Sequence, residues 1–182
     1  MTKARSGVVT HVPELFNMPR RRIMDLWLSL DPPNFEEMDG EYAAHLLDQG
    51  DRFTNIFSNS MLSLPVLHGL WLGKAFTPAD GYPGHGYNMF RSMGNVVRKY
   101  RMKTGIVPSR FDSRPCFELH YATYRNLCGF VHMVDEVRKV GNGLYLGIGT
   151  WGFTEKQRNI PLPFLLTGPM TPFSRADRQE SG

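Results

Sequence analysis

The chain has 182 residues, of which 41% are hydrophobic and 21% are charged, and its formal net charge is +4. This composition is typical of one globular domain and argues against a chain that is disordered throughout. Its densest basic run, residues 20–22 (RRR), is too short to predict a nucleic-acid surface and suits a solvated helix start better. No apolar run approaches the ~20 residues of a transmembrane helix, so a membrane partner is not expected either.

Signals for secretion, metal binding and cofactor binding are missing from the sequence. Residues 1–16 have no continuous apolar segment followed by a cleavage site. Cys116 and Cys128 fall near the two ends of one predicted strand, too far apart for a disulfide, so reduced thiols and a cytoplasmic location are expected. The six histidines lack metal-ligand spacing, and no glycine-rich nucleotide loop follows a strand. We therefore predict no metal and no cofactor.

The N-terminal third predicts helices. Residues 1–16 are expected to form a flexible arm, residues 17–169 a single domain and residues 170–182 a disordered tail. Residues 20–30 (RRRIMDLWLSL) place their apolar side chains along one helical face, and Pro32 and Pro33 end that helix. Residues 41–49 (EYAAHLLDQ) predict a second helix that stops at Gly50, with a strand beginning near Gly40 as the alternative.

Extended structure is predicted from about Pro65 onwards. Short alternating segments separated by glycines continue to about residue 108, and in one of them Arg98 and Met102 share a face. Residues 117–151 predict a three-stranded antiparallel meander, and residues 160–169 a last strand whose prolines suit a sheet edge. The fold class is therefore α+β: one or two N-terminal helices and a curved, mostly antiparallel sheet of about seven strands, which forms a barrel or cone with an internal pocket.

Two segments resemble a known family of barrels. Residues 69–76 (GLWLGKAF) and residues 133–140 (MVDEVRKV), the latter followed by LYLG at 144–147, are similar to lipocalin-like bacterial proteins named for a G-x-W-x-G signature. Trp71 stands one place later than a strict match to Gly69 requires. This resemblance implies a small-molecule barrel and assigns no catalytic residues. The succession of helices and curved sheet also resembles the cone of nuclear-transport-factor-2-like enzymes, which implies a pocket for cofactor-free isomerisation, dehydration or carbon–carbon cleavage.

A catalytic hypothesis follows from the first hairpin of the meander. If Arg125 pairs with Phe130 across the turn, His120 lies opposite Asp135, and Tyr124 shares their face. A carboxylate that orients an imidazole makes it a candidate general base near neutral pH. The alternative is a polar pair on the solvent side, and a slip of one residue would separate the two side chains.

Further side chains are candidates for binding a substrate. Arg138 anchors a carboxylate or phenolate in this hypothesis, or forms a surface pair with Glu136. The glycine-rich residues 81–87 form either the mouth of the pocket or an ordinary turn, and Lys74 is a candidate amine nucleophile only if it is buried. The predicted binding residues are Arg138, Tyr145, Trp71, His85, Tyr87 and Met133.

Three functions are compatible with these features. Aromatic residues make up 12% of the chain, which also has ten methionines, and together they indicate a hydrophobic, aromatic or terpenoid-like ligand. The first hypothesis is a cofactor-independent isomerase, lyase or cyclase that uses His120, Asp135 and Tyr124. The second is a non-catalytic carrier or sensor of the same ligand class. The third is an interaction protein that pairs through a sheet edge, and a homodimer is left open.

Overall fold

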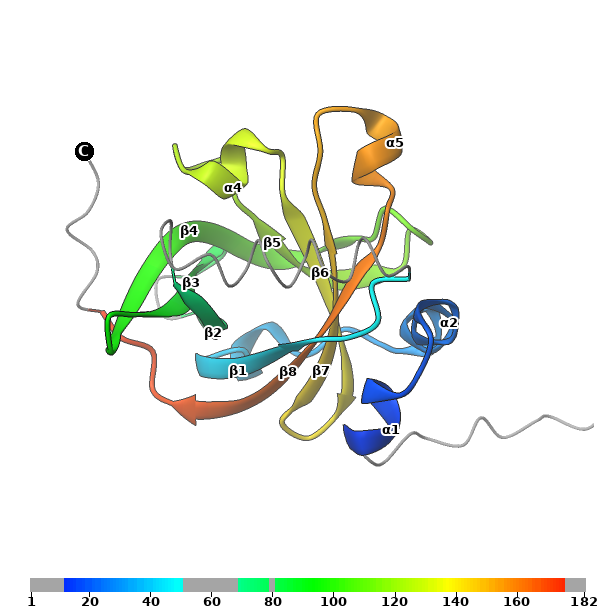
Figure 1. Ribbon diagram of the computed structural model, residues 1–182, viewed down its shortest axis with the longest axis horizontal. Helices are drawn as coiled ribbons and strands as arrows, with labels where there is room; N and C mark the ends of the chain where they lie inside the picture. Colours follow the sequence, from blue (N-terminus) through cyan, green and yellow to red (C-terminus); the bar gives the residue numbers. More distant parts are fainter. Residues whose placement is uncertain (1–11, 51–68, 79–80, 176–182) are drawn as a thin grey trace, which may run out of the picture.

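The computed structural model describes residues 12–50, 69–78 and 81–175, and within them eight strands form one closed antiparallel barrel (Figure 1). Each strand pairs with the next, and β8 returns to pair with β1. The strands are β1 Gly40–Leu46, β2 Leu70–Thr77, β3 Gly84–Ser92, β4 Asn95–Pro108, β5 Pro115–His120, β6 Val134–Gly141, β7 Leu144–Thr150 and β8 Leu162–Thr171. The predicted α+β class and the predicted barrel are confirmed, with eight strands in place of about seven.

The helices of the described residues are short and lie outside the barrel or at its ends. They are α1 Val12–Phe16, α2 Arg20–Ser29, the 3-10 helix η1 Phe35–Glu37, α4 Leu127–Phe130 and α5 Glu155–Arg158. Helix α2 forms as predicted and buries Ile23 and Trp27 against the outer face of the sheet. None of these helices is long and apolar enough to cross a membrane.

The folded domain extends beyond the predicted boundaries at both ends. Helix α1 lies within the predicted flexible arm, yet its Leu15 is fully buried in the outer apolar cluster. At the other end, strand β8 continues to Thr171, and Phe173 stacks on Tyr87 with 4.8 Å between ring centroids. Residues 1–11 and 176–182, which make up the rest of the predicted arm and tail, lie outside the described residues.

The predicted helix over residues 41–49 is wrong, and its alternative, a strand beginning near Gly40, is correct. Strand β1 alternates, with Tyr42 and Ala44 buried in the barrel core and His45 exposed. A run of neighbouring apolar residues satisfies both a helical and a strand pattern. Pairing with β2 on one side and β8 on the other decides for the strand, because closing the barrel requires it.

The last strand is not a sheet edge, although its prolines predicted one. Strand β8 pairs with both β7 and β1 along its length. Pro163 stands near the start of the strand and lacks an N–H, but its carbonyl oxygen accepts hydrogen bonds from Leu47 N (3.1 Å) and Gln49 Nε2 (2.8 Å). A proline at this position therefore removes few of the hydrogen bonds between β8 and its neighbouring strands.

The predicted meander forms as β5, β6 and β7, but its first connection is not a tight turn. Residues 121–133 include α4, whose N-cap Asn126 accepts a hydrogen bond from Gly129 N. In β4, a bulge at Tyr100 (φ 57°) accompanies a register shift against β3. Arg98 and Met102, predicted to share a face, therefore lie on opposite faces: Arg98 pairs with Glu41 outside, and Met102 is in the core.

Aromatic side chains fill one half of the barrel interior. Phe76 packs edge-on against Phe117, and Tyr42 against Tyr145, with centroid distances of 5.3 and 5.7 Å. At the end of this half, η1 brings Phe35 against the rings of Tyr82 and Phe117. This half is a packed core, so any space for a ligand must lie toward the opposite end.

Candidate functional site

A cavity of about 110 Å³, the inner pocket, lies in the other half of the barrel. It is at the end where the α4 and α5 connections meet, at the top of Figure 1, and Gly152 N donates to Val131 O (2.9 Å) to join these connections. Aromatic and aliphatic side chains dominate its lining, which consists of Leu46, Gln49, Trp71, Lys74, Asn88, Phe90, Tyr100, Leu127, Cys128, Val131, Met133, Asp135, Gly149, Thr150, Trp151, Leu162 and Phe164. Its shape and lining are those of a small-molecule site.

Four polar side chains from four parts of the barrel meet beside this pocket. They are Lys74 of β2, Asn88 of β3, Tyr121 just after β5 and Asp135 of β6, and we call them the inner quartet. Lys74 Nζ lies 2.8 Å from Asp135 Oδ2 and donates to Tyr121 Oη (2.7 Å) and Asn88 Oδ1 (2.9 Å). Tyr121 Oη donates to Asp135 Oδ2 (2.8 Å) and accepts from Asn88 Nδ2 (3.2 Å). All four are buried, so the cluster exists only because its members satisfy one another.

Aromatic rings surround the ammonium group of Lys74. Its Nζ lies 5.3 Å from the ring centroids of Trp71 and Phe164 and 5.4 Å from that of Tyr121. Such rings stabilise a cation through their negative faces. Burial, together with the nearby charge of Asp135, raises the pKa of Tyr121 well above its ordinary value, so the phenol stays protonated and remains a donor.

Two hydrogen-bonding groups of the quartet have no protein partner within the described residues. The three N–H groups of Lys74 have three partners, and Oδ2 of Asp135 has two. Oδ1 of Asp135 makes no hydrogen bond with any residue in the described ranges, and one N–H of Asn88 is likewise unused there. Both residues line the pocket, so the quartet has an acceptor and a donor without a protein partner beside it.

Two glycines of β7 make room for this arrangement. A Cβ on Gly149 would lie 2.9 Å from Asp135 Oδ1, and a Cβ on Gly147 would overlap the Phe164 ring. The glycines thus let a carboxylate and an aromatic ring lie directly against the backbone of the neighbouring strand.

The predicted contact between His120 and Asp135 is wrong by one residue of register. Leu119 lies opposite Asp135, and His120 lies opposite Val134 on the outer face. The connection that contains α4 is longer than the hairpin turn that the prediction assumed, and a shift of one residue moves a side chain to the other face. Asp135 is directed into the barrel, and His120 is not.

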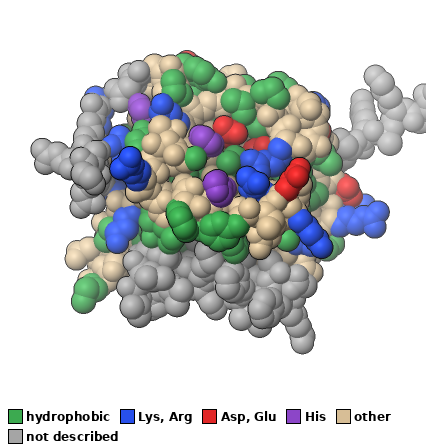
Figure 2. Space-filling view, turned by 90° about the horizontal axis from the view of Figure 1, so that it is seen from above, with side chains coloured by type: hydrophobic (Ala, Val, Ile, Leu, Met, Phe, Trp, Pro, Cys, Tyr) green, Lys and Arg blue, Asp and Glu red, His purple; other side chains and the backbone are tan. Residues whose placement is uncertain are grey.

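His120 instead belongs to a basic outer surface. His85, Lys103 and His120 occupy adjacent cross-strand positions on β3, β4 and β5. Figure 2 shows one face of the molecule on which histidine side chains stand among Lys or Arg side chains, with a few Asp or Glu side chains between them. Tyr124 lies here too, with its Oη 3.1 Å from His85 Nδ1 and the Arg101 guanidinium 4.9 Å from its ring centroid. The structure therefore brings Tyr124 to His85 and away from Asp135.

The predicted binding residues divide between the pocket and other places. Trp71 and Met133 line the pocket. Tyr145 lies in the packed core against Tyr42, and Tyr87 lies on the outer face, where its hydroxyl donates to Glu41 Oε1 (2.8 Å).

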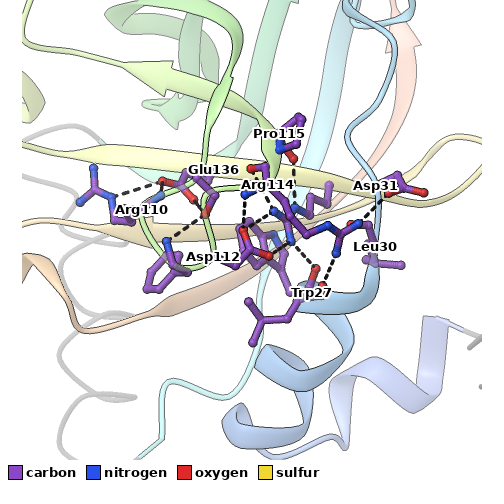
Figure 3. Close-up of polar contacts among 12 residues, drawn as sticks. Trp27, Leu30, Asp31, Arg110, Asp112, Arg114, Pro115 and Glu136 are labelled. Atoms are coloured by element: carbon purple, nitrogen blue, oxygen red, sulfur yellow. Dashed lines mark hydrogen bonds and ion pairs between the residues drawn. The ribbon is translucent and has the colours of Figure 1, made fainter.

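Arg138 is fully buried, but on the outer face of β6, where its partners Trp27, Asp112 and Pro115 are labelled in Figure 3. It donates to both carboxylate oxygens of Asp112 (2.8 and 2.7 Å) and to the Trp27 carbonyl oxygen (3.2 Å), and its guanidinium lies 4.0 Å from a Trp27 ring centroid. Its partners are protein groups, so it is not the ligand anchor that the sequence suggested.

The sequence-based reasoning missed Asn88 and Tyr121 and left Lys74 conditional on burial. A signal for Asn88 exists in β3, where one amide stands among the apolar residues 87–90 (YNMF). Tyr121 carries no such signal, because it follows the last residue of its strand. The described residues hold no group of three or more His, Cys, Asp or Glu side chains that could bind a metal.

Comparison with known proteins shows the fold alone. Neither a protein-family model nor a curated protein sequence matches the chain. A crystal structure of a protein from Thermomonospora curvata is similar, with a TM-score of 0.55 and 19% sequence identity over 82% of this chain and 87% of that one. The antiparallel barrel is the architecture that the lipocalin-like resemblance implies.

Proposed function

We propose that this protein binds a small hydrophobic molecule in the inner pocket and acts as a carrier or sensor. The observation that carries the proposal is the division of the barrel: one half is packed with aromatic rings, and the other contains an apolar pocket beside the inner quartet. A barrel built only for stability would fill both halves, because interiors pack as densely as organic crystals.

The size of the cavity supports this function. The pocket has a volume of about 110 Å³ and a mostly apolar lining. An apolar cavity of about 150 Å³ binds benzene. A ligand with the size of one small ring would therefore restore packing contacts that the empty barrel lacks.

A second candidate is a cofactor-independent isomerase or lyase, favoured by the buried carboxylate that faces the pocket. Asp135 would take a proton from a carbon atom of the ligand and return it to another, with Tyr121 and Lys74 holding the carboxylate in place. Conversion of cyclohex-3-enone into its conjugated isomer tests this chemistry, and Asp135→Asn should abolish it. We place the carrier first because the predicted base, His120, lies on the outer surface.

The binding proposal is tested by NMR titration of the ¹⁵N-labelled protein with toluene. We expect saturable shifts at Gly149 N–H and Trp71 Nε1–H, since both residues line the pocket. Met133→Trp should abolish them by filling the pocket. Met170→Trp is the matched control, because Met170 is 67% exposed near the end of β8 and does not line the pocket. Absence of saturable shifts in the unmodified protein, or shifts that survive Met133→Trp, would overturn the proposal.

A further inference from the structure

We infer that the ligand is a neutral alcohol or phenol whose hydroxyl group binds Oδ1 of Asp135 and whose apolar body, the size of one ring, fills the rest of the inner pocket. This inference rests on the proposed binding function and names the ligand class. Its first support is the unfilled acceptor: the Asp135 side chain is 4% exposed and lines the pocket, and within the described residues Oδ1 has no hydrogen-bond partner. The oxygen is not shut off from solvent, so a donor group on a ligand in the pocket can reach it.

The charge balance of the quartet excludes ionised ligands. Lys74 and Asp135 neutralise each other at 2.8 Å, and every N–H of Lys74 is already engaged. A carboxylate ligand would therefore meet a like charge and find no free ammonium donor. An amine cation would lie beside Lys74 and share its counter-ion. Burying a second unpaired charge of either sign is unfavourable, so a neutral group fits best.

The hydrogen-bonding groups of the quartet that lack a protein partner match those of a hydroxyl group. Asp135 Oδ1 needs a donor, and the second N–H of Asn88 needs an acceptor. A hydroxyl supplies one donor and two lone pairs, whereas an ether or ketone supplies only acceptors. An apolar body suits the rest of the cavity, since Trp71, Phe90 and Phe164 contribute ring surfaces to its wall.

The test compares phenol with toluene, which has nearly the same size, and with the somewhat larger anion benzoate, all as NMR ligands. Phenol should bind about tenfold more tightly than toluene, the effect expected of one hydrogen bond to a charged group, and benzoate should leave the pocket signals unchanged. The variant Lys74→Met/Asp135→Leu replaces the ion pair with apolar side chains of similar volume. It should bind toluene and lose the preference for phenol. The matched control, Glu37→Leu/Lys139→Met, removes an ion pair outside the pocket and should keep the preference.

The outcomes separate this inference from the function on which it rests. Equal or tighter binding of toluene, pocket shifts with benzoate, or an unchanged preference in the double variant would overturn the ligand class and leave binding intact. If no ligand shifts Gly149 or Trp71 in the unmodified protein, the proposed function itself is wrong. The comparison of the three ligands on the unmodified protein decides the question even if the double variant does not fold.

Discussion

Two buried ionic clusters lie on opposite faces of strand β6. Both consist of ion pairs supported by hydrogen bonds, but they differ in how many of their hydrogen-bonding atoms have protein partners. Asp135 points inward to the inner quartet, while Glu136 and Arg138 bind groups outside the barrel, among them Arg110, Asp112 and Trp27, which are labelled in Figure 3. We call the outward set, with Asp112 and Arg110, the outer cluster. In it Glu136 accepts from Ser109 Oγ (2.6 Å) on one oxygen and from Arg110 N (3.0 Å) on the other.

The difference between the clusters is hydrogen-bond saturation. Both oxygens of Glu136 and both oxygens of Asp112 are bound by protein donors, and together these contacts join the β4–β5 connection and α2 to the sheet. In the inner quartet, one oxygen of Asp135 is left over and faces a cavity. A buried carboxylate therefore indicates a ligand-binding site only when one of its oxygens has no hydrogen-bond donor from the protein.

The largest effect is expected from breaking the outer cluster. Arg138→Met should lower the free energy of unfolding by about 3–5 kcal/mol, because it removes the buried cation that donates to both oxygens of the Asp112 carboxylate. Toluene should still shift the pocket signals of the folded variant. Urea unfolding at neutral pH measures the change. Lys139→Met, at the next position but in a partly exposed ion pair, should cost less than about 1 kcal/mol, and similar losses for both variants would contradict the distinction.

The inner quartet should show a different pattern. Lys74→Met alone should cost about 3 kcal/mol, because it leaves the Asp135 charge buried without a cation. The double variant Lys74→Met/Asp135→Leu should recover part of that loss, because it removes the unpaired charge but leaves the Tyr121 hydroxyl without its acceptor. A double-mutant cycle of urea unfolding curves measures the coupling. Losses that simply add would show that the two side chains are not an interdependent pair.

A smaller effect is expected at the glycine that makes room for Phe164. Gly147→Ala should cost about 1–3 kcal/mol, because the new Cβ overlaps a ring in a packed interior. Displacing the ring should also weaken toluene binding, since Phe164 lines the pocket. Gly141→Ala is the control, because a Cβ there has nothing within 4 Å. A Gly147→Ala protein as stable as this control would contradict the packing described here.

The smallest effect is the pH dependence of the outer cluster. Hydrogen bonds from Arg138 hold the pKa of Asp112 below its ordinary value. A carboxyl group with a lowered native pKa stabilises the fold above its unfolded pKa of about 3.9, and that contribution is lost as pH falls through the lower native value. Stability should thus decline below about pH 4. Asp112→Asn should be less stable near neutral pH but decline less steeply in acid, and parallel curves for the two proteins would refute this assignment.

Local patterns were sufficient for some features. Helix α2 was predicted because its apolar spacing and the following prolines are local signals, and the order of β5, β6 and β7 followed from alternation. The same apolar spacing misassigned β1, where the pairing partners decide the conformation. Trp71 and Met133, which were predicted to bind a substrate, line the pocket. Arg138 was predicted to bind one as well, but the sequence could not show that its side chain lies on the outer face of β6.

Local sequence signals were enough to predict amphipathic strands that follow helices, because periodicity and proline stops act over a few residues. Which face of each strand lies inside the barrel depends on contacts between distant parts of the chain. That choice depends on the length of the α4 connection, the bulge at Tyr100 and the closure of β8 on β1. A shift of one residue exchanges the faces of a strand. Here it placed Asp135 beside Lys74 and left His120 outside, and no local pattern specifies that result.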